Sequence, residues 1–560
     1  MSNVSAVWDP ITIEVVRHKL DGIANEMQST LLRSSFSPVV REGLDASASL
    51  FTVAGEPLAQ AVAIPIHLGT MIPIVRTIVD TYPIEQMAEG DIFILNDPYA
   101  GGTHLPDIGL VMPVVHSGRV IALSAAITHH QDVGGMTPGS VPTNAREIFQ
   151  EGIRLPALRL RERGVMNETL LQIIRLNVRM PETFMGDLNA QIAACTVGAR
   201  RLGELAARYG HNLILSIFDE LLDRSELLTR EALRRIPNGT YRFVDWMDND
   251  GVDLEQRVRV EVSVRIDDGT MHCRFDGTAP QVKGPINCVP SGSLAAAYFA
   301  VRALTDPSIP SNGGCFRPVT VELPEASLVN PVEPAAVNAR TPTIKRVTSC
   351  ILAAFKEVMP DKVPADSAGE TVTQAFGFQR RNGKSVVAGE FLSGGSGGSA
   401  IADGVDVIDT DATNCMNLPV EALEMDMPVR IERFGLAIDS GGPGLHRGGL
   451  GMVREYLILA DRIVFSHRGE RYFTPTFGSH GGGSGAVSSG TIIRADGRVE
   501  PIQSKTETVL AKGDRLILVT PGGGGYGDPR DRDRALVQAD IADGKVSLAA
   551  AQDIYEIPQA

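Results

Sequence analysis

Cysteine is sparse in this 560-residue chain, and its spacing excludes the common cysteine-based sites. The six cysteines are widely and irregularly separated, and none forms a CxxC pair. A zinc ribbon is therefore excluded, and such spacing in a large chain is typical of reduced thiols rather than of a disulfide framework. We expect the cysteines to act as small buried hydrophobic residues.

Long apolar runs and basic clusters are also missing. No apolar run reaches the roughly 18–20 residues that cross a bilayer, and the first ten residues lack the basic and apolar regions of a signal peptide. The formal net charge is −15, and no cluster of lysine and arginine offers the basic face that nucleic-acid phosphates require. We therefore expect a cytoplasmic protein that binds neither nucleic acid nor a membrane.

A phosphate-binding loop is the third absence. The nearest approach to a Walker pattern, residues 377–385, has five residues between its glycines where four are required. Its Asn-Gly step lies between apolar stretches, which favours a hairpin turn. Three glycine-rich stretches, residues 394–399, 439–444 and 522–527, could surround an anion with backbone amides. None is clearly followed by a helix, so we expect tight turns with positive φ there.

The composition that is present is that of a large globular protein. Hydrophobic residues make up 43% of the chain and charged residues 21%. The length suggests several interlocked domains, and the patterns predict an α+β fold of mixed sheets and β-hairpins with an inserted helical segment. We place an N-terminal metal-binding domain at 1–165, the helical segment at 166–237, a glycine-rich β/α domain at 238–530 and a tail with a short helix at 531–560.

Local patterns predict the following elements. Apolar residues at helical spacing, with capping residues, predict helices near residues 10–31, 67–81, 294–305 and 533–543, besides those of the helical segment. Alternating or buried apolar runs predict strands at residues 47–53 and 91–96, a hairpin of 108–115 with 120–128, and strands between 239 and 276. The remainder up to about residue 529 is expected to mix strands and turns.

The densest group of metal-binding side chains lies between Asn96 and Asp132. Residues 96–107 (NDPYAGGTHLPD) and 128–132 (THHQD) together contain three histidines and three aspartates. Histidine and aspartate are ligands that borderline divalent metals accept. A single histidine at a strand end is usually just solvated, but this concentration at the ends of adjacent strands favours a metal site.

The hairpin between these two motifs should bring its open ends together. With a turn near Ser117-Gly118, position 107 pairs near 128, so Asp107 lies beside His129. A two- or four-residue loop with strict alternation puts these two side chains on opposite faces of the sheet. A three-residue loop or a bulge would put them on one face, and the sequence alone does not select between these registers.

Beyond these motifs, the chain resembles the hydantoinase B/oxoprolinase family over essentially its whole length. The segments that carry the resemblance occur in the family's order and are 96–107 (NDPYAGGTHLPD), 126–135 (AITHHQDVGG), 147–152 (EIFQEG), 284–287 (GPIN), 439–451 (DSGGPGLHRGGLG) and 520–529 (TPGGGGYGDP). The family contains subunits of ATP-dependent hydantoinases, lactamases and oxoprolinases, and also of acetone- and acetophenone-type carboxylases.

The resemblance implies one divalent metal ion, and a ligand set of two histidines and two carboxylates suits manganese, zinc or iron. The ligands that the resemblance implies are Asp45, His104, Asp107 and His129. Asp45 comes from the resemblance alone, within residues 41–49 (REGLDASAS), where the glycine and two alanines depart from the family pattern. His130, Asp132 and Glu151 are candidates for positioning the ligands or transferring protons.

The resemblance also implies a partner and a reaction. A separate A-type chain would bind ATP and magnesium, and it would phosphorylate the amide oxygen of a hydantoin, 5-oxoproline or lactam. The complex would contain two copies of each chain. Phosphorylation makes a poor electrophile reactive, and a divalent ion can then activate water for attack. The alternative is a subunit of an ATP-dependent acetone- or acetophenone-type carboxylase. A non-catalytic scaffold is a third reading, against which the four intact ligand positions argue.

Overall fold

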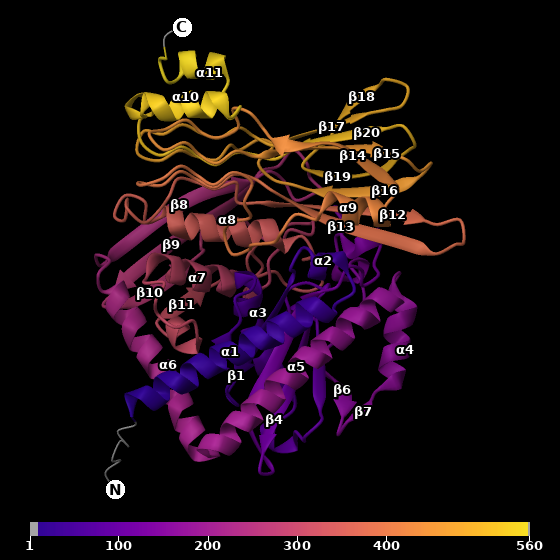
Figure 1. Ribbon diagram of the computed structural model, residues 1–560, viewed down its shortest axis with the longest axis vertical. Helices are drawn as coiled ribbons and strands as arrows, with labels where there is room; N and C mark the ends of the chain where they lie inside the picture. Colours follow the sequence, from indigo (N-terminus) through magenta and orange to yellow (C-terminus); the bar gives the residue numbers. More distant parts are fainter. Residues whose placement is uncertain (1–8, 558–560) are drawn as a thin grey trace.

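Two halves, each built around β-sheets, stack along the long axis of the molecule (Figure 1). The computed structural model describes residues 9–557, apart from the side chain of Leu68. The half drawn mainly in indigo and magenta comes from the N-terminal part of the chain, and the half drawn in orange and yellow comes from the glycine-rich C-terminal part (Figure 1). Within the described residues, no helix is long and apolar enough to span a membrane.

A seven-stranded sheet, in the order β2-β1-β5-β4-β3-β6-β7, forms the centre of the first half. Its strands are β1 (Ala46–Phe51), β2 (Pro57–Gln60), β3 (Ile92–Leu95), β4 (Asp107–His116), β5 (Arg119–His129), β6 (Leu158–Glu162) and β7 (Val165–Met166). Both faces of its central strands are buried, as the burial patterns of β1, β3 and β4 show. β3 and most of β4 are apolar, whereas β1 alternates alanine with the buried serines Ser47 and Ser49.

Helices cover both faces of this sheet. α1 (Pro10–Ser34) and α5 (Pro181–Tyr209) pack on one face, and α3 (Pro65–Thr81) packs on the other. The Asp9 side chain caps α1 by accepting from the Ile11 and Thr12 amides, as its Asp-Pro start predicts. The remaining helices of this half are α2 (Pro38–Arg41), α4 (Glu168–Asn177) and α6 (His211–Leu233), so the predicted helical segment is α4 to α6.

The sequence allowed two registers for the β4–β5 hairpin, and the structure has the register that contains a bulge. Its turn is short, since His116 pairs with Arg119, but the register shifts by one residue between Val114 and Val115. A bulge of this kind changes which side chains share a face. Asp107 and His129 are consequently direct cross-strand partners at the open end of the hairpin.

A second, four-stranded sheet lies between the two halves. Its strands are β8 (Gly239–Met247), β9 (Val258–Asp267), β10 (Thr270–Arg274) and β11 (Val319–Glu322), in the order β11-β10-β9-β8. The helices α7 (Pro290–Leu304) and α8 (Arg340–Ala353) link it to α3, because α7 packs on both α3 and α8, and α8 packs on β8 and β9. Helix α8 falls where only strands and turns were expected, and it begins at the candidate site.

Two further sheets form the second half. One, in the order β13-β12-β16-β19, is built from β12 (Thr371–Gln379), β13 (Ser385–Ser393), β16 (Ile463–Arg468) and β19 (Lys505–Leu510). The other, in the order β14-β15-β20-β17-β18, is built from β14 (Val429–Leu436), β15 (Met452–Ile458), β17 (Ser489–Ile493), β18 (Val499–Pro501) and β20 (Arg515–Val519). The short helices are α9 (Val420–Asp426), α10 (Arg534–Ala542) and α11 (Leu548–Asp553).

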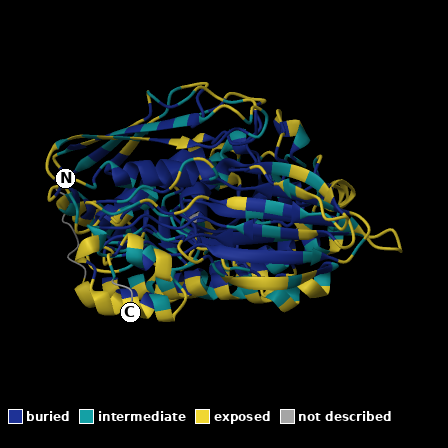
Figure 2. Ribbon diagram, turned by 90° about the horizontal axis from the view of Figure 1, so that it is seen from above, coloured by how far each residue is buried: buried dark blue, intermediate teal, exposed yellow. Residues whose placement is uncertain are grey.

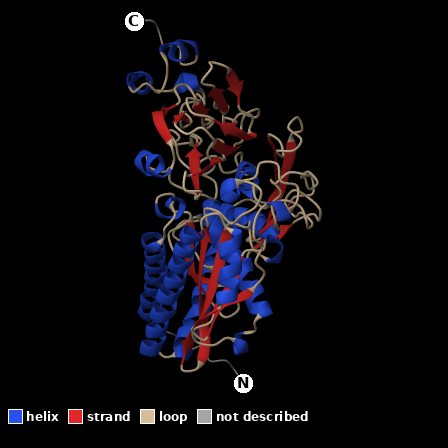
Figure 3. Cartoon of the chain, turned by 90° about the vertical axis from the view of Figure 1, so that its right-hand side faces the viewer, coloured by secondary structure: helices blue, strands red, loops and turns tan. Residues whose placement is uncertain are grey.

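The predicted elements agree with the structure in their main features. The α+β class is confirmed, with mixed and antiparallel sheets (Figure 3). The near-Walker segment is indeed the turn of a hairpin, because β12 ends at Gln379 and β13 begins at Ser385. Figure 2 shows buried residues filling the interior, with exposed positions on the outer helices and loops. The domain boundaries given above remain a prediction.

The glycine-rich stretches are not the positive-φ turns that we expected. Apart from Asp439 and Gly527, their residues have ordinary φ values, and the segments run side by side beneath α10 (Figure 1). The N–H groups of Gly523, Gly524 and Gly525 donate in turn to the carbonyls of Gly449, Asp366 and Gly483, which belong to three different segments. Consecutive residues can bond to three different segments only if extended backbones lie in direct contact. Glycine is therefore required here because the backbones approach closely, and not because the chain turns.

A methyl group in this glycine bundle should destabilise the second half. The Cβ of Gly395→Ala would lie 1.9 Å from the carbonyl oxygen of Gly449. We expect Gly395→Ala to lower the free energy of unfolding by at least the roughly 1–3 kcal/mol typical of overpacking. Gly435→Ala is the control, since no heavy atom lies within 4 Å of its Cβ. Equal melting temperatures for the two variants would contradict this account of the bundle.

Candidate metal centre

Two aspartates and a histidine, Asp45, Asp107 and His129, meet at one end of the strands of the first sheet. Asp107 begins β4 and His129 ends β5, while Asp45 directly precedes β1 and its carbonyl accepts from the His129 amide. Side chains alternate along a strand, so Asp107 and His129 share the face on which Ile127 and Val111 join the core around α3. His67, in the first turn of α3, completes the cluster from that face.

His104, Asp107 and His129 each place one ligand atom within 4.8 Å of the others. His104 Nε2 lies 2.9 Å from Asp107 Oδ1 and 3.2 Å from His129 Nδ1, and His129 Nδ1 lies 3.1 Å from Asp107 Oδ1. Asp45 is slightly further out, with its Oδ2 3.9 Å from His129 Nδ1. The structure thus brings three of the four predicted ligands together and the fourth beside them.

The hydrogen-bonding roles of this triad suit a bound cation. His104 Nδ1 lies 3.0 Å from the carbonyl oxygen of Asn338, which can only accept, so this nitrogen carries the hydrogen. Its Nε2 is then a lone pair that faces the carboxylate of Asp107. His129 Nδ1 has one hydrogen at most and can satisfy only one of these two acceptors. Facing acceptors of this kind are stabilised by a cation between them, which is the chemistry of a metal site.

Burial and neighbouring charges keep the triad in the protonation state that metal binding needs. Burial, together with the Arg340 guanidinium, lowers the pKa of His104 to about 3, so its imidazole is neutral. Burial by itself would raise the pKa of Asp107, but the Arg340 guanidinium holds it well below its usual range. Thr103 Oγ1 donates to Asp107 Oδ2 at 2.6 Å, and Arg340 forms an ion pair with the same oxygen. Asp107 is therefore a fixed carboxylate with Oδ1 free for a ligand.

Asp45 is in a different electrostatic state. Burial raises its pKa, and the imidazoles of His129 and His67 oppose that rise. His67 Nε2 lies 3.4 Å from Asp45 Oδ1 and 3.7 Å from Asp107 Oδ2, so this imidazole bridges the two carboxylates. A divalent ion at the triad would favour the ionised form of Asp45.

Glu151 supports the triad through the backbone at Asn338. Its carboxylate accepts from the amides of Val337 and Asn338 at 2.8 to 3.1 Å, and it is fully buried. The carbonyl of Asn338 in turn fixes the orientation of His104. Burial raises the pKa of Glu151 to about 8, with those two amides opposing the rise. Glu151 thus contacts the candidate ligand His104 only indirectly, through the backbone of Asn338.

His130 and Asp132 have other partners. Alternation points His130 away from His129, toward α5, where its Nε2 lies 3.0 Å from Gln191 Oε1 and its ring packs 4.2 Å from Phe184. Asp132 accepts from the amides of Gly134 and Gly139 and forms an ion pair with Arg179. Neither side chain lines the pocket at the triad, and neither does Glu151.

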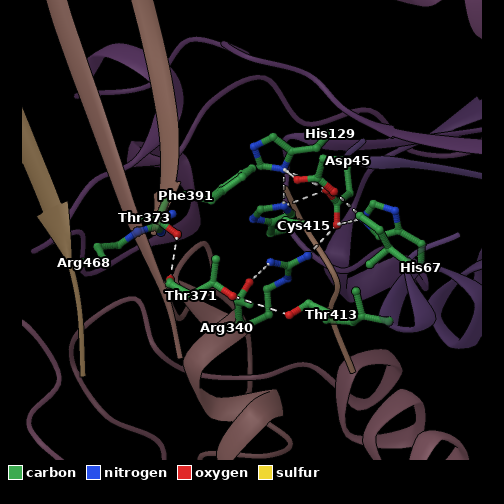
Figure 4. Close-up of a pocket in the computed structure, with 15 residues that line it drawn as sticks. Asp45, His67, His129, Arg340, Thr371, Thr373, Phe391, Thr413, Cys415 and Arg468 are labelled. Atoms are coloured by element: carbon green, nitrogen blue, oxygen red, sulfur yellow. Dashed lines mark hydrogen bonds and ion pairs between the residues drawn. The ribbon is translucent and has the colours of Figure 1, made fainter. Parts of the chain in front are cut away.

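The triad forms one wall of a pocket between the first sheet and the β12–β13–β16 sheet (Figure 4). Phe391 from β13 approaches the His129 ring edge-on, with 6.4 Å between the ring centroids. Burial raises the pKa of the Cys415 thiol well above its ordinary value, so it is not a thiolate nucleophile at neutral pH. The lining residues are Asp45, Ile64, Ile66, His67, His104, Asp107, His129, Arg340, Thr341, Thr371, Thr373, Phe391, Thr413, Cys415 and Arg468.

Sequence reasoning missed His67, Arg340 and Arg468. His67 lies at the start of a helix without any motif, Arg340 begins a helix that was not predicted, and Arg468 ends β16 far along the chain. No local spacing signals these residues, because packing between distant segments brings them to the pocket. An unexplained arginine at a strand or helix end is the only weak signal that the sequence offers.

Sequence comparison identifies relatives that span nearly the whole chain. A family model described as hydantoinase B/oxoprolinase matches residues 9–529. The chain is 33% identical over 569 residues to the B-type subunit of a putative D-/L-hydantoinase from Pseudomonas sp. (strain NS671), covering 98% of this chain and 95% of that protein. The resemblance drawn from the motifs is thereby confirmed.

Two solved structures share the fold. The ATP-dependent caprolactamase from Pseudomonas jessenii superposes with a TM-score of 0.90 at 30% identity, covering 99% of this chain and 97% of that one. The nucleotide-free structure of acetone carboxylase gives a TM-score of 0.89 at 20% identity, covering 98% of this chain and 80% of that one. The second likeness shows a common fold alone.

Proposed function

The chain belongs to the hydantoinase B/oxoprolinase family, and from that premise we propose that it is the metal-carrying subunit of an ATP-dependent cyclic amide hydrolase. The observation that carries the proposal is the convergence of His104, Asp107 and His129 in a pocket where a buried arginine is paired with Asp107. Its substrates would be hydantoins, 5-oxoproline or lactams, the ring amides named in the family and its relatives.

We propose Asp45, His104, Asp107 and His129 as the metal ligands, with His67 as a further candidate. Two imidazoles and two carboxylates suit manganese, zinc or iron. A bound divalent ion would supply a Lewis acid that polarises a carbonyl or phosphoryl oxygen. Glu151 would act as a positioning residue, because it fixes the peptide whose carbonyl orients His104. His130 and Asp132 would support the strand end from the other face of the sheet.

The residues of the pocket would bind and orient an amide ring. Arg340 and Thr103 hold Asp107, so its free oxygen keeps one position during binding. Phe391 offers an apolar surface beside His129 and would limit access of bulk water. The neutral thiol of Cys415 argues against a covalent thioester route.

ATP handling would belong to a partner A-type chain. The hydantoinase relative is named as one subunit of its enzyme, which implies a second subunit in that protein. This chain has a hairpin turn where its nearest Walker-like segment lies. The partner would phosphorylate the amide oxygen, and this chain would receive the activated ring. A hydrolase is favoured over the carboxylase alternative because the lactamase structure is 30% identical to this chain and acetone carboxylase only 20%.

The purified chain alone should not bind ATP. Residues 380–384 form the turn between β12 and β13, so their amides do not form a phosphate-binding loop that leads into a helix. Calorimetric titration with Mg-ATP should show no binding at micromolar concentrations. A micromolar dissociation constant would assign the ATP site to this chain and contradict the division of labour.

Co-expression with an A-type chain should give a stable complex, with two copies of each chain, that opens a cyclic amide. The measurements are size-exclusion chromatography with light scattering, and ring opening of hydantoins, 5-oxoproline and lactams with and without ATP. Separate elution of the chains would overturn the partner proposal. An intact complex that consumes none of these rings in the presence of ATP would overturn the hydrolase proposal.

Replacing His104 by alanine should remove the metal and the turnover together. The imidazole supplies one of the three converging ligand atoms, while the fold rests on large cores outside the site. Elemental analysis of the purified complex measures metal content, and circular dichroism checks the fold. His130→Ala is the matched control, because this adjacent histidine faces α5 and should leave the metal content unchanged. Equal metal content in His104→Ala and the wild type would show that the site is misplaced.

A further inference from the structure

Arg468 is a buried cation that forms no ion pair with any acidic side chain among residues 9–557. The other buried arginines of the described chain each form an ion pair with a carboxylate. These pairs are Arg340–Asp107, Arg346–Asp245, Arg447–Asp406, Arg454–Glu390, Arg471–Asp366 and Arg532–Asp540. Arg468 is only 6% exposed, yet no carboxylate of the described residues lies within ion-pair distance of it. A buried charge is costly unless it is paired, so the partner is expected from outside the chain.

Within the part of the chain that the structure describes, the Arg468 side chain makes one hydrogen bond, which leaves most of its donors free. Its Nη1 donates to Asn338 Oδ1 at 2.8 Å, which is a neutral amide oxygen. Glu151 is the nearby acid, but its carboxylate accepts from the amides of Val337 and Asn338 instead. Burial and the neighbouring Arg340 lower the pKa of Arg468 to about 9, so the guanidinium stays charged at neutral pH. A guanidinium has five N–H donors, and the N–H groups of Arg468 that make no hydrogen bond within the described residues suit a planar or tetrahedral oxyanion.

The pocket places this free guanidinium across from the candidate ligands. Figure 4 shows Arg468 and Thr373 on the side opposite Asp45 and His67, and all four line the same pocket. Helix α8 also begins at this wall, with Arg340 and Thr341 in its first turn, and the N-terminus of a helix carries partial positive charge. The wall therefore favours a negatively charged group within reach of the triad.

We infer that Arg468 binds a phosphoryl group of the pocket's ligand. The inference rests on the proposed function, because ATP-dependent activation of a ring amide puts a phosphoryl group on its oxygen. The reacting carbon would then lie between Arg468 and the triad, with the ring against Phe391. Water would add to the reacting carbon, and the ring C–N bond would break as its nitrogen takes a proton, which leaves an acyl phosphate. A second water would hydrolyse that acyl phosphate to a carboxylate and inorganic phosphate, which the same N–H groups of Arg468 would hold.

The test measures phosphate binding separately from turnover. Inorganic phosphate is titrated calorimetrically into the metal-loaded chain, with acetate as the carboxylate probe. Arg468→Gln should weaken phosphate binding by about tenfold or more, since it removes a charged hydrogen-bond donor. Arg381→Gln, in the exposed turn between β12 and β13, should bind phosphate as the wild type does. Metal content should be the same in all three proteins.

A second variant removes the free charge without removing the arginine. Asn338→Asp would give Arg468 a carboxylate partner of the same shape, and the Nδ2 atom that it replaces is buried without a hydrogen-bond partner. We expect this variant to weaken phosphate binding as well, while the backbone carbonyl that faces His104 is retained. It also keeps the test decisive if Arg468→Gln does not fold.

The outcomes separate this inference from the proposed function. Phosphate binding that is unchanged in Arg468→Gln, or in Asn338→Asp if the former does not fold, would overturn the role of Arg468. Acetate binding that depends on Arg468, with no such dependence for phosphate, would overturn the phosphoryl assignment in favour of a substrate carboxylate. Failure of the wild-type complex to open any ring would instead count against the proposed function, whatever the phosphate titration shows.

Discussion

The one-residue bulge in the β4–β5 hairpin is the constraint on which the site depends. Without it, alternation along the strands would put Asp107 and His129 on opposite faces of the first sheet. With it, both side chains face α3, where His104 and Asp45 join them. The same alternation sends His130 to the other face, which explains why two adjacent histidines have different surroundings.

Distant segments complete what the hairpin begins. The loop before α8 supplies Asn338, whose backbone amide, backbone carbonyl and side-chain oxygen connect Glu151, His104 and Arg468 respectively. The β16 strand, held in its sheet by β12 and β19, sets the position of Arg468. The pocket therefore exists only when both halves of the molecule are folded and packed together, and stability of the second half becomes a requirement for the site in the first.

Sequence alone predicted the parts of this architecture that local rules determine. Apolar periodicity gave α1 and the helical segment, and the turn residues gave the β4–β5 hairpin. The position of the bulge, the helix α8 and the roles of His67 and Arg468 depend on long-range packing, which no local pattern reports. The glycine stretches were misread for the same reason, because the constraint on them is contact between segments and not the conformation of a turn.

The charges of the pocket argue that metal and anion belong to one site. Asp45 and Asp107, when ionised, balance the formal charges of Arg340 and Arg468 in the pocket. A divalent ion bound there would leave an excess of about two positive charges in a buried environment, where uncompensated charge is costly. A phosphoryl group carries about that much negative charge near neutral pH. The aspartates thus suit the metal, and the arginine without a carboxylate suits the ligand that would bind beside it.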